Sequence, residues 1–571
     1  MMARGRALLS RPIEERMKIH SLLGALLLAA MLAPHAADAQ AKPEDKVKVR
    51  ARLGPEHGGD AVMMPYAIFR SSPTAIMVMR SPEFGPGSRV KRGPRIDVYD
   101  YEKLIHERGM EPAMKRMGQE QLFLEDLVRY NGKPVMLARN VREADVSLFY
   151  QYLDPHLTKA PPSFDPICSF PVQYKVFKPA VEKPGNLTRD RFQAAIARDS
   201  SHMIIHGPHL VDPEGTAFRL VCAVDRQMQP VWQHVVRMDS KVERSEVLDA
   251  AIDANGVGYL LVRHRAKGRP YWGGSSTYET VLLRLDAGDI ASMPVSLPEG
   301  AQPTGGVLRD FGKGIVWAGI YAQPGDGSGK LKGNFIATTE PDSTGSLPAR
   351  AIPFTGEPLS DEEVSERNEA TEVAESDEED DDKKKDEKRL DWVTDVVDLV
   401  ERGDGGWFLV NEVGFTISRI DGETRRGRRT FYHGPILARS FDKDWLQQWS
   451  TLFRRWTVTG SPVTGRTMVA AFDKKLNLFM IDEEEQVEMR KQKLKITPKD
   501  QGKPNTVHTA FDDKGVVRTK VLLKGDIARD FFGNWRTVRS GKDQFLGFGA
   551  DGMGGARYLP VRIDLTKDEK K

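Results

Sequence analysis

Cysteine is scarce in this chain: its 571 residues include only Cys168 and Cys222. Two thiols do not provide the disulfide framework that stabilises small secreted domains. The chain therefore depends on a hydrophobic core, for which apolar residues supply 40% of the sequence. The two cysteines either form one disulfide or pack as two small buried apolar side chains, a common role of free cysteine.

An excess of charge of one sign is also missing. Lys and Arg together number 84, and Asp and Glu number 81. Proteins dedicated to nucleic-acid binding usually show a strong basic bias. The balance of charges therefore argues against a nucleic-acid partner.

Residues 1–39 have the pattern of an export signal. Arg16 and Lys18 precede the apolar run Leu22–Leu32, and a small-residue cleavage site ends at Ala39. The run is too short to span a membrane comfortably. We expect a cleavable signal peptide, a periplasmic or secreted location, and no transmembrane segment in the mature chain.

Helical periodicity is scarce as well. The best candidate helix, residues 101–123, is interrupted at Gly109 and Pro112, two residue types that disfavour a helix interior. Short turns recur instead, each followed by an apolar run. Asn255-Gly256 is the clearest of them, because both residues can adopt the positive φ that a hairpin turn requires. The turn centres lie at residues 72, 132, 200, 256, 313, 405, 474 and 541.

The repeating unit predicts four short strands. In the clearest copy these are Val247–Ile252, Gly258–Val262, Thr280–Leu285 and Met293–Leu297. Four-stranded units with no helices between them are typical of a β-propeller or of a string of sandwiches. We expect an all-β fold, a single β-propeller over residues 40–571 with eight four-stranded blades; seven blades is the alternative.

An aspartate ends the third strand of several units, as Asp225 and Asp442 do. Aspartate favours turns because its carboxylate accepts hydrogen bonds from nearby backbone N–H groups. The regular recurrence of these residues therefore predicts turn formation rather than a ring of ligands.

The last unit, residues 535–565, supplies three strands but no fourth. Residues 46–53 alternate apolar and charged side chains, with Val49 on one predicted face and Arg50 on the other. This segment is predicted to complete the last blade and so to close the ring. Closure leaves few strand edges exposed, and we expect a monomer.

The repeat also bears on the two cysteines. It places Cys168 on the outer strand of one blade and Cys222 on the third strand of the next. A disulfide requires Cα atoms within about 7 Å. Two such strands are not expected to come so close, which favours the packing alternative.

Two segments stand out by their charge. Residues 358–389 contain almost no apolar side chains and predict a disordered insert between the fifth and sixth units, because such a composition buries too little surface to offset the entropy of ordering. Residues 424–429, TRRGRR, predict a solvated loop; the alternative is a contact for an anionic partner such as a surface polymer.

Motifs that carry catalysis or bind metals are missing. The chain has no G-x-S-x-G elbow. His202 and His206 lie on a predicted strand, roughly 13 Å apart, too far to share one ion. That leaves only His206 and His209, which flank a turn. We therefore expect no catalytic constellation, no metal site and no cofactor.

One aromatic segment suits ligand recognition. Tyr271, Trp272 and Tyr278 lie in a long connection between two strands that is also rich in Gly and Ser. Loops of this composition are common in binding surfaces, so these three residues are the candidate ligand-binding residues. Most other tryptophans lie on predicted strands, where they are expected to anchor the packing of blades: Trp232, Trp317, Trp392, Trp407, Trp449 and Trp535.

The repeats VLDAAIDANGVGYLLV, YETVLLRLD, FRLVCAVDRQMQPVW and FDDKGVVRTKVLL resemble those of a group of uncharacterised exported bacterial proteins with β-propeller-type repeats. The resemblance implies a fold and no activity. The leading hypothesis is an exported non-catalytic propeller, a binding or scaffold module whose partner is an unknown envelope protein or surface polymer. The alternative is a propeller-class enzyme such as a glycan-processing hydrolase or lyase, with catalytic residues drawn from separate blades.

Overall fold

The computed structural model describes residues 47–567 with internal gaps. The gaps are 60–62, 83–93, 113–121, 142–144, 160–162, 173–190, 240–241, 267–277, 313, 323–330, 340–344, 355–386, 421–426, 460–466, 495, 497–502, 525–535, 540–543 and 552–555. The predicted signal peptide lies outside the described residues. Residues 49–565 form one compact unit; residues 1–48 and 566–571 form a second, of which only the ends of two strands are described.

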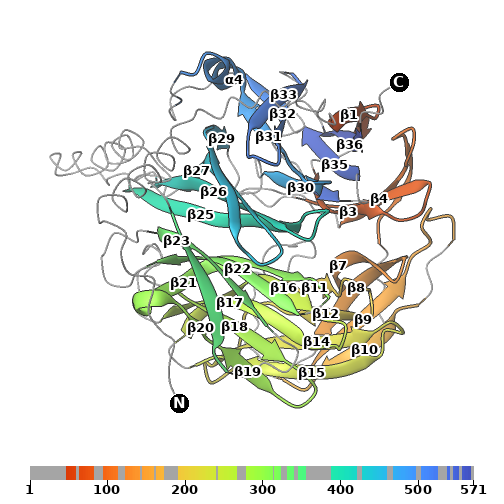
Figure 1. Ribbon diagram of the computed structural model, residues 1–571. Coiled ribbons are helices and arrows are strands. Elements are labelled where there is room, and N and C mark those ends of the chain that lie inside the picture. Colours follow the sequence, from red (N-terminus) through yellow and green to blue (C-terminus); the bar gives the residue numbers. More distant parts are fainter. Residues whose placement is uncertain are drawn as a thin grey trace, which may run out of the picture. The chain divides into compact units, whose positions relative to one another are not determined.

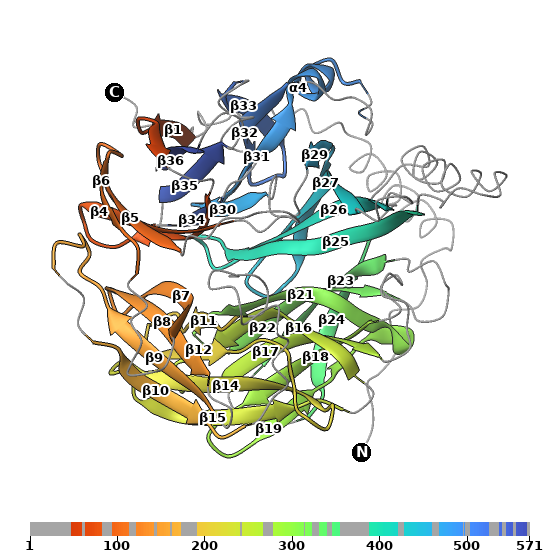
Figure 2. The ribbon, with the colours of Figure 1, turned by 180° about the vertical axis from the view of Figure 1, so that it is seen from behind.

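The larger unit is an eight-bladed β-propeller, as the turn spacing predicts, and the seven-blade alternative is wrong (Figures 1 and 2). Blade 1 contains β3 (Met63–Arg70), β4 (Ala75–Pro82), β5 (Arg95–Asp100) and β6 (His106–Met110), and blade 2 contains β7 (Leu122–Tyr130), β8 (Lys133–Val141), β9 (Val146–Tyr152) and β10 (Asp165–Phe170). Blade 3 contains β11 (Gln193–Ile196), β12 (His202–His206), β14 (Ala217–Asp225) and β15 (Pro230–Arg237), with the short β13 (Leu210–Val211). Blade 4 contains β16 (Val242–Ile252), β17 (Gly258–Ala266), β18 (Tyr278–Leu285) and β19 (Ile290–Met293).

Blades 5 to 8 follow the same plan. Blade 5 contains β21 (Gln302–Asp310), β22 (Ile315–Ala322), β23 (Leu331–Thr338) and β24 (Leu347–Pro353), with the short β20 (Val295–Ser296). Blade 6 contains β25 (Glu387–Glu401), β26 (Trp407–Ile420), β27 (Gly427–Phe441) and β28 (Gln447–Phe453), with β29 (Thr457–Thr459), and blade 7 contains β30 (Met468–Phe472), β31 (Lys475–Glu483), β32 (Pro504–Phe511) and β33 (Val517–Leu523). Blade 8 contains β34 (Arg536–Arg539), β35 (Gln544–Asp551), β36 (Ala556–Lys567) and β1 (Val47–Leu53), with β2 (His57–Gly59). The helix α4 (Glu484–Lys491) follows β31, and the short 3-10 helix η2 (Pro298–Gly300) precedes β21.

The first strand of each blade lies on the inside of the ring. The first strands β7, β11, β16, β21 and β25 each contact the first strand of the blade before and the blade after, and β3 contacts both β7 and β34. Phe479 of β31 and Phe545 of β35, whose ring centroids are 5.7 Å apart, join blades 7 and 8. Six of the eight predicted turns, centred at 72, 132, 200, 256, 405 and 474, connect the first two strands of a blade. The centres at 313 and 541 fall between the same two strands of their blades in the sequence but lie outside the described residues.

The recurring aspartates form turns, as predicted. One carboxylate oxygen of Asp225 accepts the backbone N–H groups of Gln227 and Gln229, at 2.8 and 2.9 Å. The carboxylate of Asp442 makes the equivalent bonds in blade 6. The residue three positions later has positive φ in both turns: 64° for Met228 and 62° for Trp445. Because each of these carboxylates accepts hydrogen bonds from backbone N–H groups of its own turn, the role of the aspartates is structural.

The fourth strand of blade 4 differs from the expectation. We predicted Met293–Leu297, whereas the strand is Ile290–Met293. The chain then leaves the blade, and β20 pairs in parallel with β24 of blade 5. Both stretches are short and apolar, so composition alone does not separate the end of one blade from the start of the next.

The ring closes as predicted, because β1 pairs with β36 and completes blade 8. The Gly54 N–H donates to the Pro560 carbonyl at 2.9 Å. Val49 and Ala51 are half-buried and Arg50 is exposed, as the alternation requires. The pattern fails at Leu53, which is 37% exposed, where the strand ends.

The two charged segments need their boundaries corrected. Residues 355–386 lie outside the described residues and connect β24 with β25, that is, blades 5 and 6. Residues 387–389, placed in the insert by their charge, instead pair with β26. Residues 427–429, expected in a solvated loop, begin β27 and pair with residues 418–420; residues 424–426 are outside the described part. Composition alone predicts a loop wherever charged side chains occupy the end of a strand, as they do here.

Blade 3 presents a different set of side chains to each neighbouring blade, because side chains alternate along a strand. Ile205, Leu220 and Cys222 pack against residues of blade 2. Ile204 and Val221 pack against residues of blade 4. The two faces of blade 3 therefore bury different side chains. In the part of the chain that the structure describes, no helix is long and apolar enough to span a membrane.

Candidate functional site: a cationic pocket between blades 3 and 4

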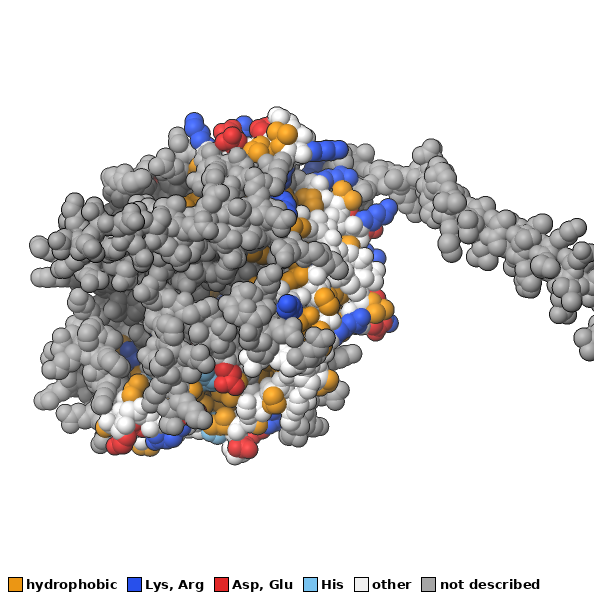
Figure 3. Space-filling view, turned by 90° about the vertical axis from the view of Figure 1, so that its left-hand side faces the viewer, with side chains coloured by type: hydrophobic (Ala, Val, Ile, Leu, Met, Phe, Trp, Pro, Cys, Tyr) orange, Lys and Arg blue, Asp and Glu red, His pale blue; other side chains and the backbone are white. Residues whose placement is uncertain are grey.

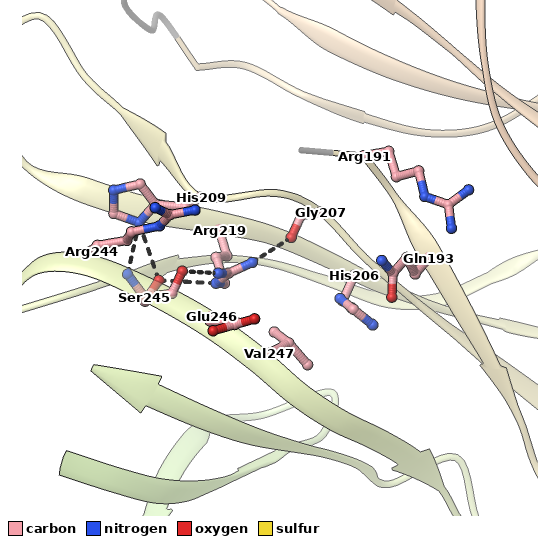
Figure 4. A pocket seen from close by; sticks show the side chains of 10 residues that line it. All are labelled: Arg191, Gln193, His206, Gly207, His209, Arg219, Arg244, Ser245, Glu246 and Val247. Atoms are coloured by element: carbon pink, nitrogen blue, oxygen red, sulfur yellow. Dashed lines mark hydrogen bonds between the residues drawn. The ribbon is translucent and has the colours of Figure 1, made fainter. Parts of the chain in front are cut away.

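Polar side chains replace the apolar core at one end of the interface between blades 3 and 4. They line a cavity of about 90 Å³ (Figure 4). Its walls come from the segment that enters β11, the end of β12 and the loop after it, the start of β14 and the start of β16; the lining residues include Arg191, His206, His209, Arg219, Arg244 and Glu246. The tight turn between β11 and β12 lies at the opposite end of blade 3. The volume suits several water molecules or one compact anionic group.

Arg219 lies at the centre of the pocket and is 5% exposed. Its position on β14 is two residues from Val221, so it points toward blade 4. Its guanidinium donates to the Gly207 carbonyl at 2.8 Å, to the Ser245 hydroxyl at 3.0 Å and to the Ser245 carbonyl. These three acceptors are uncharged and fix the guanidinium in position.

His206 ends β12 and is 7% exposed. Its Nδ1 has no hydrogen-bond partner within the described part of the chain. Burial, followed by the positive charges of Arg219 and Arg191, lowers the pKa of His206 to about 3. The imidazole is therefore neutral at neutral pH and has an unused polar atom beside two guanidinium groups.

Two more histidines respond to the same positive field. The Nδ1 atom of His209 accepts the Ser245 N–H at 3.3 Å, which requires the neutral ring to carry its proton on Nε2. Burial, then Arg219 and Arg244, lowers the pKa of His209 to about 4. Burial and Arg219 also lower the pKa of His264. Burial is the largest cause of each of these shifts, and the nearby arginines add to it.

One acid lies among the cationic groups. Glu246 is close to Arg219 and His206 in Figure 4, but its carboxylate accepts a hydrogen bond from Arg263 at 2.9 Å. Arg191 is held by a bond of 2.9 Å to the Glu125 carbonyl. Three arginines and one paired glutamate leave a net positive pocket, a setting that favours an anion.

A metal ion does not fit the described residues. No group of three or more His, Cys, Asp or Glu side chains in the described ranges could hold one. Of the three histidines singled out by sequence, the structure brings His206 and His209 to the same pocket. His202 starts β12, at the far end of the strand, where its Nδ1 bonds Ser201. Arginine, rather than carboxylate or thiolate, surrounds the histidine pair, and repulsion disfavours a cation there.

A second buried polar cluster lies at blades 6 and 7. Glu412 bonds His433 Nδ1 at 2.7 Å with one oxygen, and Arg455 and Thr467 at 2.9 and 2.7 Å with the other. Burial works against the charge on Glu412, but Arg455 and His433 outweigh it and lower its pKa to about 2. Because both carboxylate oxygens are engaged, this cluster suits packing of the blades better than catalysis.

The aromatic candidates are placed only in part. Tyr271 and Trp272 lie outside the described residues, and Tyr278 begins β18, with its side chain not described. The strand ends that flank this segment are informative. Ala266 pairs with Val242 at the start of β16, two residues before Arg244 of the pocket. The two described strand ends that border this segment, Ala266 and Tyr278, therefore lie at the pocket end of blade 4.

The strand tryptophans are blade-packing anchors, as predicted, where their side chains are described. Trp232, Trp317, Trp407 and Trp449 are all at most 8% exposed. The indole N–H of Trp232 donates to the Gly256 carbonyl of blade 4 at 2.7 Å. These rings are not available as a platform for stacking carbohydrate.

The arginines of the pocket were missed by sequence reasoning. They lie far apart along the chain, and only the strand register brings them together. His206 pairs with Val221, which places Arg219 beside it on the same face. A signal was present in the sequence: the strand AFRLVCAVD is mostly apolar, but Arg219 lies on the same face of the strand as the buried Val221. A charge at a predicted core position is informative, because charged side chains are almost never fully buried unless they are paired.

Comparisons with known proteins assign no family. No protein-family model and no curated protein matches the chain. Among solved structures, a polysaccharide lyase, Uly1, is 9% identical over 90% of this chain and 99% of its own, with a TM-score of 0.37. A protein of unknown function from Dyadobacter fermentans is 11% identical over 66% and 96% of the two chains, at 0.29. An alpha-L-arabinanase from Penicillium chrysogenum is 10% identical over 66% and 98%, at 0.27. Scores this low carry no argument about activity.

Proposed function

We propose that this protein is an exported binding module that captures an anionic group of an acidic surface polymer in the pocket between blades 3 and 4. The observation that carries the proposal is the lining of one pocket by Arg191, Arg219 and Arg244; the charges of Arg219 and Arg191 act on the ring of His206, whose Nδ1 has no partner among the described residues. Guanidinium groups are the preferred partners of carboxylate and sulfate oxygens, because their planar donors match those acceptors.

The size and position of the pocket support a polymer. About 90 Å³ admits one charged group, so the rest of a larger ligand has to lie outside. The described strand ends that border the segment with Tyr271 and Trp272 lie at this end of blade 4. We infer that Tyr271, Trp272 and Tyr278 contact the sugar rings that flank the bound group, because aromatic side chains provide rigid contact area at low entropic cost.

The enzyme alternative has weaker support. Glycoside hydrolysis generally requires two carboxyl groups, and among the described residues that line the pocket only Glu246 is a carboxylate. His206 is a weak base because its pKa is low. A general base works best with a pKa near the operating pH. The pocket as described is better suited to binding than to proton abstraction.

The test is a calorimetric titration of the chain with three polymers of matched length: a polyuronate, a sulfated glycan and a neutral glucan. New reducing ends are assayed in the same samples. We expect binding of at least one acidic polymer, weakened by salt, no binding of the neutral glucan and no cleavage. Cleavage of an acidic polymer would establish the enzyme alternative. Equal binding of all three polymers, or of none, would overturn the anionic pocket.

A further inference from the structure

Cys168 and Cys222 meet inside the interface between blades 2 and 3. Their Sγ atoms are 2.9 Å apart, and both side chains belong to one buried cluster. Cys222 is fully buried and Cys168 is 8% exposed. The expectation that an outer strand and a third strand stay apart is wrong here. The outer strand β10 contacts both β14 and β15, and Gln233 of β15 donates to the Ser169 carbonyl at 3.1 Å.

We propose that Cys168 and Cys222 form a disulfide that clasps blade 2 to blade 3 in the exported protein. Shortening the contact from 2.9 Å to the roughly 2.05 Å of a disulfide requires a shift of under 1 Å. The strand that carries Cys168 can supply it, because β10 has a bulge between Pro166 and Cys168, and bulges adjust the aim of a neighbouring side chain. The proposal is independent of the cationic pocket.

The bond forms by thiol–disulfide exchange with a disulfide-bearing oxidant, a protein or small-molecule disulfide of the oxidising compartment. The Cys168 thiolate attacks the oxidant, giving a mixed disulfide and releasing one thiol. The Cys222 sulfur then attacks Cys168 Sγ and releases the second thiol. The two cysteines lose two electrons and two protons in total, and the oxidant is reduced to two thiols.

Folding sets the order of events. In the closed interface the neighbouring Cys168 and burial raise the pKa of the Cys222 thiol, and a protonated thiol is a poor nucleophile. Exchange therefore takes place while the two blades are still coming together. Once formed, the bond lies in the core, where soluble reductants do not reach it.

The first test is peptide mapping by mass spectrometry of protein exported with its own residues 1–39. Free thiols are alkylated at lysis, and the digest is run without reduction. We expect a linked pair of peptides containing Cys168 and Cys222; a sample reduced in denaturant before alkylation is the control and should give two labelled peptides. Two alkylated peptides from the unreduced sample would overturn the proposal.

The second test compares melting temperatures with the Cys168→Ala/Cys222→Ala double variant. The bond closes a loop of more than 50 residues, so denaturing, reducing and refolding the wild type should lower its melting temperature by about 4 °C. The same treatment should leave the double variant unchanged, because it has no thiols. If the wild-type protein melted at the same temperature before and after reduction, this result would contradict the proposed disulfide, even if the variant failed to fold.

Discussion

Deleting residues 40–54 is expected to abolish cooperative unfolding and to produce an aggregating protein. The deletion removes β1, the fourth strand of blade 8, and uncovers the edge of β36. Unpaired strand edges template association with other chains. Without β1 the N-terminal end of the repeat array is joined to this sheet only through the three-residue strand β2. Scanning calorimetry and light scattering at several concentrations measure both effects.

The matched control for this deletion is removal of residues 40–46, which keeps β1 complete. We expect the control to unfold in one transition and to stay monodisperse, like the parent. If the longer deletion behaved as the control does, closure of the ring through β1 would contribute little, and the blades would be stable as an open array.

Reversing one charge in the pocket, by Arg244→Glu, is expected to weaken binding of the acidic polymer about tenfold or more. The change replaces an attraction by a repulsion at the wall of the pocket, where two unit charges in contact interact by about 1 to 4 kcal/mol, depending on their exposure to water. Arg244 is exposed, so the melting temperature should change little. Calorimetric titration gives the dissociation constant of the variant and of the parent.

Arg226→Glu is the control for this substitution. Arg226 also belongs to blade 3 and is half-exposed, but it bonds Asp199 at the opposite end of the blade. The net charge of the two variants is equal, so a nonspecific effect of charge would weaken binding in both. Parent-like affinity in Arg244→Glu, or equal losses in the two variants, would place the ligand elsewhere.

The architecture was largely predictable because its signals are local. Asn255-Gly256 specifies a hairpin through the φ angles of two adjacent residues, and Asp225 specifies a turn through bonds to N–H groups two and four residues away. Eight such turns at similar spacing, together with a last unit that lacks one strand and a spare strand at residues 46–53, are enough to predict a closed ring of eight blades.

The site was not predictable in the same way because it depends on contacts between strands. His206, Arg219 and Arg244 meet only when β12 pairs with β14 and blade 3 packs against blade 4. The prediction that Cys168 and Cys222 lie far apart was wrong for a related reason. The repeat gives the order of strands within each blade, but not how far the outer strand of one blade extends over the next blade. Local sequence patterns contain neither the register nor the packing of one blade on another.

The central claim, that an anion binds beside the neutral histidines of this pocket, is tested most directly by proton uptake during binding. His206 and His209 are neutral in the free protein because their pKa values are about 3 and 4. A bound anion favours the charged imidazolium and raises both pKa values, so the complex holds more protons than the free protein at pH values between the free and the bound pKa. Affinity should therefore rise as pH falls, by up to tenfold per pH unit for each proton taken up.

The measurement is calorimetric titration of the acidic polymer at pH 5.5 in two buffers with different heats of ionisation. We predict that the apparent binding enthalpy differs between the buffers in the sense of proton uptake, and that His206→Asn reduces this difference while Arg226→Glu leaves it intact. Equal enthalpies in the two buffers, with an affinity that does not change between pH 7.5 and pH 5.5, would contradict the account.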